Sequence, residues 1–196
     1  MNLLIVMHFK DEFLETSHDV YDYFRRVLKL PESQIYFYSQ ETWTRGVSLI
    51  DRVNELIAKN TPLVIYYGGH GLRNGWQLSS SVEVPYKTLV STLRKQKKPL
   101  VILNDCCYGM ALQPHLRELQ CDHLLLGLSP KNKEGYDDQG FVKSITKCWK
   151  KHRLADPKLW VLKKEKLSRF VLEKCGGRLR YGAALDHLCY PKSRRR

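Results

Sequence analysis

Residues 63–71, LVIYYGGHG, and residues 100–109, LVILNDCCYG, follow the same pattern, in which a short apolar run leads into a polar segment that contains glycine. A proline stands directly before each run. A continuous apolar run of this length between turn residues is typical of a strand that is buried on both faces of a parallel sheet. The two stretches therefore predict two buried strands, with His70 in the loop after the first and Cys107 in the loop after the second.

The rest of the chain repeats this alternation of apolar runs and helical spacing. Further strands are predicted at 3–7, 35–38, 124–128 and 183–189. Helices are predicted from Ser17 to Pro31, over 45–59, after Pro85, and over 138–152 and 158–174. Strands that alternate with helices of this length imply right-handed crossovers and a parallel sheet covered on both faces. The predicted fold class is α/β, with three α/β/α layers.

Length and composition exclude several classes of protein. The chain has 196 residues, of which 43% are apolar and 27% charged, as expected for one folded domain. No apolar run approaches the roughly 18 residues that cross a membrane, and the first residues lack the basic and apolar regions of a secretion signal. We therefore expect no membrane partner and a cytoplasmic or nuclear location.

The six cysteines form no CxxC pair. Without a secretion signal, they are expected to be reduced thiols, and their spacing does not match a zinc site. We predict no metal and no cofactor.

The basic residues are unevenly distributed. Residues 147–196 hold 16 of the 33 basic residues and only 4 of the 20 acidic ones. Within this part, residues 147–166 combine two tryptophans with eight basic residues. Such a segment suits contacts with phosphates and stacking on bases, or an acidic protein partner. A solvated helix with a basic tail is an equally simple interpretation.

The two loops point to nucleophilic chemistry. Ligands of open α/β sheets bind beyond the carboxyl ends of the strands, where His70 and Cys107 would meet if their strands are neighbours. A thiolate can then attack a carbonyl while an imidazole moves the proton. The backbone N–H groups of Gly71 and Cys107 could form an oxyanion hole. Asp105 would lie near the thiol, and Cys106 would point into the core.

At these loops the chain resembles the caspase and metacaspase superfamily of cysteine peptidases. The segments YYGGHG at 66–71 and NDCCYG at 104–109 are similar to the family's glycine-flanked histidine and its D-x-C turn. The resemblance implies a caspase-like domain over 1–191, with a large-subunit-like half over 1–120, a small-subunit-like half over 121–191 and a basic tail at 192–196. It also implies a mostly parallel six-stranded sheet whose last strand is antiparallel.

The resemblance implies a Cys-His dyad, with Cys107 as nucleophile and His70 as the general acid and base. The D-x-C form is closer to metacaspases, in which acidic residues bind a substrate Arg or Lys in the S1 pocket. Asp105 matches one of these acids. Asp19, in a segment similar to the start of the family's first helix, matches the other. The implied function is a cysteine endopeptidase that cleaves protein or peptide substrates after Arg or Lys.

Some features depart from the family. The separation of 37 positions between His70 and Cys107 is shorter than the roughly 50 of caspases. Gly68 replaces the usual serine, and the calcium-binding acidic cluster is not visible. An alternative is therefore a catalytically weak or inactive caspase-like binding module, whose basic C-terminal quarter engages nucleic acid or an acidic protein. The sequence leaves open whether the chain is a monomer or a homodimer.

Overall fold

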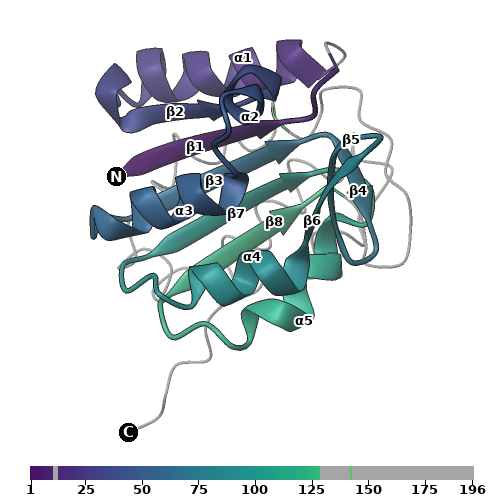
Figure 1. Ribbon diagram of the computed structural model, residues 1–196. Helices are drawn as coiled ribbons and strands as arrows, with labels where there is room; N and C mark the ends of the chain where they lie inside the picture. The colour runs from purple at the N-terminus through teal and green to yellow at the C-terminus, as the bar shows by residue number, and fades with distance from the viewer. Residues whose placement is uncertain (11–12, 129–141, 143–196) are drawn as a thin grey trace, which may run out of the picture.

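Five parallel strands form the central sheet of the protein (Figure 1). The computed structural model describes residues 1–10, 13–128 and 142. The strands lie in the spatial order β2-β1-β3-β7-β8, and every neighbouring pair is parallel. Their bounds are β1 Asn2–Met7, β2 Ile35–Tyr38, β3 Leu63–Gly68, β7 Leu100–Asp105 and β8 His123–Gly127. The α/β class with a parallel sheet is thus confirmed. The predicted strand at 183–189 lies outside the described residues.

Helices cover both faces of this sheet and complete the three layers (Figure 1). One face carries α1 (Leu14–Asp22) and the π-helical turn η2 (Tyr23–Val27) that continues it. The other face carries α3 (Leu49–Ala58), α4 (Tyr86–Leu93) and α5 (Gln113–Leu116). The short helices η3 (Glu32–Gln34), α2 (Gln40–Thr44) and η4 (Gly109–Leu112) lie in the connections.

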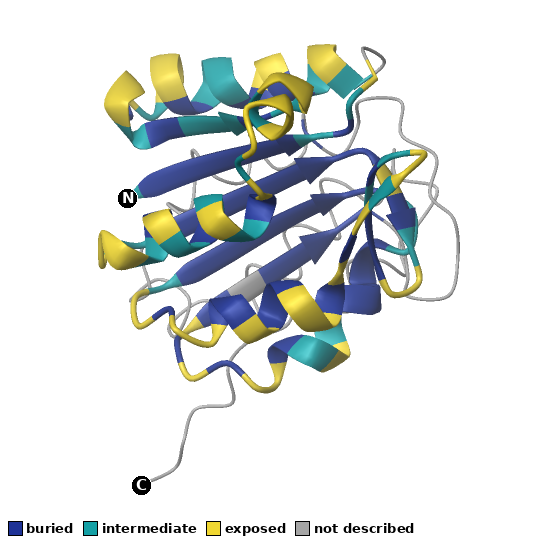
Figure 2. Ribbon diagram, viewed as in Figure 1, coloured by how far each residue is buried: buried dark blue, intermediate teal, exposed yellow. Residues whose placement is uncertain are grey.

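The central strands β1, β3 and β7 are buried on both sides, which explains their continuous apolar sequence (Figure 2). In β1, Leu3 and Ile5 pack with Phe24 of η2, whereas Leu4 and Val6 pack into the core on the opposite face. This division follows from the strand geometry, because successive side chains point to opposite faces of a sheet. A sheet that is covered twice needs apolar residues at every position rather than at every second one.

The direction in which the chain adds strands changes at β1. From β1 the chain crosses the α1 face to reach β2, and it then returns across the opposite face, through α3, to reach β3 on the other side of β1. The later crossovers through α4 and α5 stay on that second face. The carboxyl ends of β1 and β3 therefore form a topological switch point, where ligands of open α/β sheets bind.

A second, smaller sheet stands beyond the carboxyl ends of the main strands (Figure 1). It consists of the antiparallel strands β4 (His70–Leu72), β5 (Gly75–Ser79) and β6 (Val82–Pro85). The polypeptide enters it directly from β3 and leaves it into α4. Because β4 begins at His70, this small sheet determines where the candidate histidine lies.

The predicted start of the first helix was wrong. Helix α1 begins at Leu14, three residues before the predicted cap Ser17. Ser17 is buried inside the helix, and its hydroxyl donates a hydrogen bond to the carbonyl oxygen of Phe13 at 2.9 Å. A serine that bonds back to the preceding turn is accommodated within a helix and does not have to cap it.

The helix predicted over 45–59 is shorter and follows a break. Gly46 has a φ of +81°, a left-handed conformation that ends the preceding α2. Ser48 then caps α3, because its hydroxyl accepts a hydrogen bond from the backbone N–H of Asp51 at 3.0 Å. Local turn chemistry therefore divides a segment whose apolar spacing predicts one continuous helix.

Candidate active site

The loops after β3 and β7 lie side by side at the carboxyl edge of the sheet. Gly68 is the register partner of Asp105, and the backbone N–H of Gly69 donates to the carbonyl oxygen of Asp105 at 3.3 Å. The sequence predicted that His70 and Cys107 would meet only if their strands are neighbours. Strands β3 and β7 are direct neighbours, so this condition is met.

Gly71 is the point of closest approach between these loops. A Cβ atom at this position would overlap the carbonyl oxygen of Cys107 and would lie 2.7 Å from the Sγ atom of Cys106. Position 71 therefore accepts only glycine without a backbone shift. The absence of a side chain is what lets the segment that carries His70 pack directly on the segment that carries Cys107.

The His70 side chain is exposed, but two aromatic rings border it. The ring centroid of His8 lies 4.8 Å from that of His70, and the ring centroid of Phe13 lies 5.2 Å from it. Both rings stand nearly perpendicular to the imidazole, at 79° and 85°. His8 and Phe13 are neighbours of the candidate base that the sequence analysis missed. The sequence signal that could have identified His8 is its position directly after the apolar run of β1, at the carboxyl end of a strand.

The backbone of His70 is held from inside the domain. The hydroxyl oxygen of Tyr67 lies 2.7 Å from the carbonyl oxygens of both His70 and Gln77. The Tyr67 ring stacks on Trp76 with a centroid distance of 4.5 Å. Both aromatic side chains are fully buried. Burial raises the pKa of the Tyr67 hydroxyl well above its usual value, so it remains a hydrogen-bond donor.

Asn104 organises the turn that carries Cys107. It is fully buried, and its Oδ1 atom accepts hydrogen bonds from Trp76 Nε1 at 2.6 Å and from Cys106 Sγ at 3.4 Å. Its Nδ2 atom donates to the carbonyl oxygen of Gly109 at 2.6 Å. Tyr108 adopts the left-handed conformation, with a φ of +54°, between these anchors. The side chain of Asn104 thus closes the turn around the candidate nucleophile.

The side chain of Asp105 lies on the sheet face that α1 covers. It is buried, with 6% of its surface exposed, and the hydroxyl of Tyr66 donates a hydrogen bond to its Oδ2 atom at 2.9 Å. Cys106, the next residue, is buried in the core on the opposite face. The prediction that Cys106 points into the core is therefore confirmed.

Asp19 is in a different environment from Asp105. Because the helix begins earlier than predicted, Asp19 lies in the second turn of α1. Its side chain is exposed. Among the residues that the structure describes, its carboxylate has no hydrogen bond or ion pair with the His70 and Cys107 loops. Its assignment to an S1 pocket stays a prediction.

The three described cysteines differ in access to solvent. Cys107 is half-buried, whereas Cys106 and Cys121 are buried. Burial raises the pKa of the Cys106 thiol well above its usual value and that of Cys121 to about 11. At neutral pH the two buried side chains are therefore protonated thiols, which are poor nucleophiles.

These differences predict selective alkylation. In the folded protein at about pH 7.5, iodoacetamide is expected to modify Cys107 at least about tenfold faster than Cys106 or Cys121, because the reagent needs an accessible thiolate. Peptide mapping by tandem mass spectrometry, with and without denaturant, measures the rates. Equal rates for Cys107 and Cys121 in folded protein would contradict the assigned burial.

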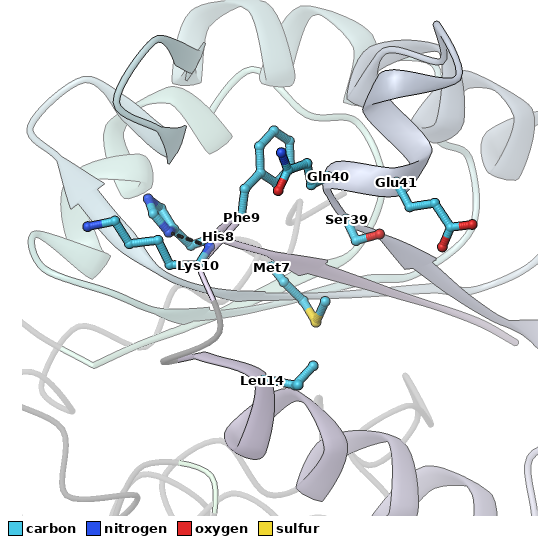
Figure 3. Close-up of a pocket in the computed structure, with 8 residues that line it drawn as sticks. All are labelled: Met7, His8, Phe9, Lys10, Leu14, Ser39, Gln40 and Glu41. Atoms are coloured by element: carbon cyan, nitrogen blue, oxygen red, sulfur yellow. Dashed lines mark hydrogen bonds between the residues drawn. The ribbon is translucent and has the colours of Figure 1, made fainter.

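A pocket of about 160 Å³ opens at the carboxyl ends of β1 and β2. Figure 3 shows Met7 and Leu14 on one side of the end of β1, and Phe9 and Gln40 on the other side. The remaining lining residues are His8, Lys10, Ser39 and Glu41. Since His8 also contacts His70, the pocket adjoins the candidate site.

Comparisons with known proteins assign no family to the chain. No protein-family model matches it, and its sequence matches no curated protein. Within the described residues, no group of three or more His, Cys, Asp or Glu side chains could hold a metal ion, and no helix is long and apolar enough to cross a membrane. The basic residues of 147–196 and, apart from residue 142, the predicted helices and strand beyond 128 lie outside the described part.

Proposed function

We propose that the protein is a cysteine endopeptidase with Cys107 as nucleophile and His70 as general acid and base, similar to metacaspases. The observation that carries the proposal is the direct packing of Gly71 on the backbone of Cys107. It supports the proposal because residues 70 and 107 are then on adjoining segments, at the sheet edge where α/β enzymes bind their ligands. The substrate is a protein or peptide, and no cofactor or metal is required.

The proposed reaction has two steps. The Cys107 thiol transfers its proton to His70, and the thiolate attacks the carbonyl carbon of the scissile peptide bond. The C–N bond breaks as the imidazolium donates its proton to the leaving amine, which leaves a thioester on Cys107. A water molecule then attacks the thioester while His70 accepts a proton from it. The C–S bond breaks, the carboxylic product leaves and the thiol regains its proton.

Two backbone N–H groups would stabilise the oxyanion of both steps. Gly71 pairs with Trp76 in the β4–β5 hairpin, one position from the Leu72 and Gly75 pair that closes its two-residue turn. Hydrogen-bonded and open pairs alternate along antiparallel strands, and the pair that closes such a turn is hydrogen-bonded. This alternation directs the N–H of Gly71 away from β5, so that it can serve with the N–H of Cys107 as an oxyanion donor.

We propose that Asp105 gives the site its preference for a substrate Arg or Lys. Its carboxylate lies at the end of the strand that leads to Cys107, and the hydrogen bond from Tyr66 holds its orientation. A carboxylate with restricted solvent access binds a guanidinium or ammonium group more strongly than an exposed one does. Asp19 is the second proposed acid, on α1.

Hydrolysis of fluorogenic peptides with Arg, Lys, Asp or Ala before the scissile bond tests the proposal. Under reducing conditions, we expect cleavage after Arg or Lys, with Cys107→Ala protein as the blank. Cleavage after Asp would preserve the nucleophile but refute the acidic pocket. Folded protein that cleaves no peptide would favour the binding-module alternative.

The variant Asp105→Asn isolates the charge in the same assay. It retains the shape of the side chain and its acceptor for Tyr66, and it is expected to lower kcat/KM for the Arg peptide about 10- to 100-fold, the range of a lost charged hydrogen bond. Asp122→Asn, an exposed change at the opposite end of the sheet, should leave the rate unchanged and is the matched control. Asp19→Asn tests the second acid in parallel.

A further inference from the structure

Three aromatic rings, two from the segment that follows β1 and one from the start of β4, meet at the carboxyl end of β1. The ring centroids of His8, Phe13 and His70 are separated by 4.8, 5.2 and 5.4 Å, and all three pairs have an edge-on geometry. His8 and Phe13 contact each other as well as His70, so they form one continuous wall beside its imidazole. Edge-to-face contacts at these distances are favourable and define a relative orientation.

The wall is rigid on the His8 side because several contacts hold that residue. Its side chain is buried, with 3% of its surface exposed, and its backbone N–H donates to the carbonyl oxygen of Gly68 at 3.0 Å. A Cβ atom at Gly69 would lie only 2.9 Å from the Cβ atom of His8. The bare glycine backbone before His70 thus packs against His8.

The ring of His8 is also oriented. Its Nδ1 atom accepts a hydrogen bond from the backbone N–H of Lys10 at 3.1 Å (Figure 3). An acceptor at Nδ1 carries no proton, so the neutral ring holds its proton on Nε2. This contact uses the Nδ1 lone pair of His8 within its own loop and fixes the plane of the ring.

We propose that His8 is a positioning residue for His70, and that it acts as an aromatic wall. The inference rests on the proposed peptidase function, in which His70 must receive a proton from Cys107 and pass it to the leaving amine. An exposed imidazole without a wall can populate several staggered rotamers, and only those aimed at the reacting atoms are productive. A displacement of about 1 Å in such a group can cost roughly a hundredfold in rate.

A matched pair of variants separates the ring from the rest of the side chain. His8→Phe and His8→Leu both remove the acceptor for the Lys10 N–H, but only phenylalanine retains an aromatic wall. We expect His8→Leu to lower kcat about 10- to 100-fold with KM within about threefold of the native value, because substrate contacts are untouched. His8→Phe should remain within about threefold of the native kcat. His18→Ala, an exposed histidine on α1, is the control.

NMR tests the same proposal without substrate. The ring protons of His70 should give shifted signals in native protein and in His8→Phe, and should move toward the values of a free histidine in His8→Leu. If native protein cleaves no peptide, the proposed function fails, and these signals still decide whether His8 orients His70. If His8→Leu does not fold, Phe13→Leu removes the second ring and should move the same signals.

Three outcomes would overturn the proposal. The first is an unchanged kcat in folded His8→Leu protein. The second is a loss in His8→Phe as large as that in His8→Leu, which would mean that a polar function of His8 matters rather than its ring. The third is a set of His70 ring signals that does not respond when either neighbouring ring is removed.

Discussion

The variant Cys107→Ala is expected to show no peptide cleavage above the uncatalysed rate, and His70→Ala is expected to lower kcat about 10²- to 10⁴-fold. The thiol supplies the atom that forms the thioester, so that alanine removes the pathway itself. The imidazole contributes general acid and base catalysis, for which this range is typical. Initial rates with the preferred Arg or Lys peptide under reducing conditions measure both losses.

The double variant makes this prediction sharper. Residues that act as one catalytic unit have non-additive effects, so that the double variant with both alanines should be no slower than Cys107→Ala alone. The matched controls are Cys121→Ala, at the far end of the sheet, and His18→Ala, which should both remain active. Residual cleavage by Cys107→Ala at a tenth of the native rate would eliminate Cys107 as the nucleophile.

The variant Asn104→Ala is expected to lower the free energy of unfolding by about 2–5 kcal/mol. The change leaves the Trp76 Nε1–H donor and the Gly109 carbonyl oxygen buried without the partner that each now has. Each buried polar group that loses its partner costs about 1–3 kcal/mol, and the small cavity adds to this. Urea unfolding followed by circular dichroism should give a lower midpoint with an unchanged slope.

A half-buried asparagine provides the control for this effect. Asn54 on α3 accepts a hydrogen bond from Lys95 Nζ at the surface, and Asn54→Ala should change stability by at most about 0.5 kcal/mol. The hydrogen bonds of Asn104 also close the turn after β7, so that the variant should lose peptidase activity at temperatures where it is still folded. Stability of Asn104→Ala equal to that of Asn54→Ala would refute the role of the buried network.

Much of the main sheet could be predicted because its central strands are buried on both faces. In the apolar runs at 3–7, 35–38, 63–67 and 100–103, nearly every position is apolar, and the described strands begin within one residue of each run. The strict alternation of side chains also placed Cys106 in the core. These predictions depend only on burial and local geometry, and both leave a direct pattern in the sequence.

The start of α1 was less predictable because a serine has two uses near a helix. Serine is a residue type that often caps helices, but the hydroxyl of Ser17 donates a hydrogen bond back to the carbonyl oxygen of Phe13 inside the helix. Whether the serine caps the helix or lies within it depends on whether helical packing stabilises the residues that precede it. The resulting shift places Asp19 in the second turn, so that the predicted pocket acid lies in a different part of the helix from the one expected.

By itself, the amino-acid sequence determined the layered α/β class, the two glycine-containing loops and the chemical types of His70 and Cys107, since apolar periodicity and residue identity are local properties. Only the tertiary structure decided that β3 and β7 are neighbours, that Gly71 packs on the backbone of Cys107, and that His8 and Phe13 border His70. Those contacts join residues far apart in the chain. They depend on strand order and on the close fit of side chains, neither of which leaves a periodic signal in the sequence.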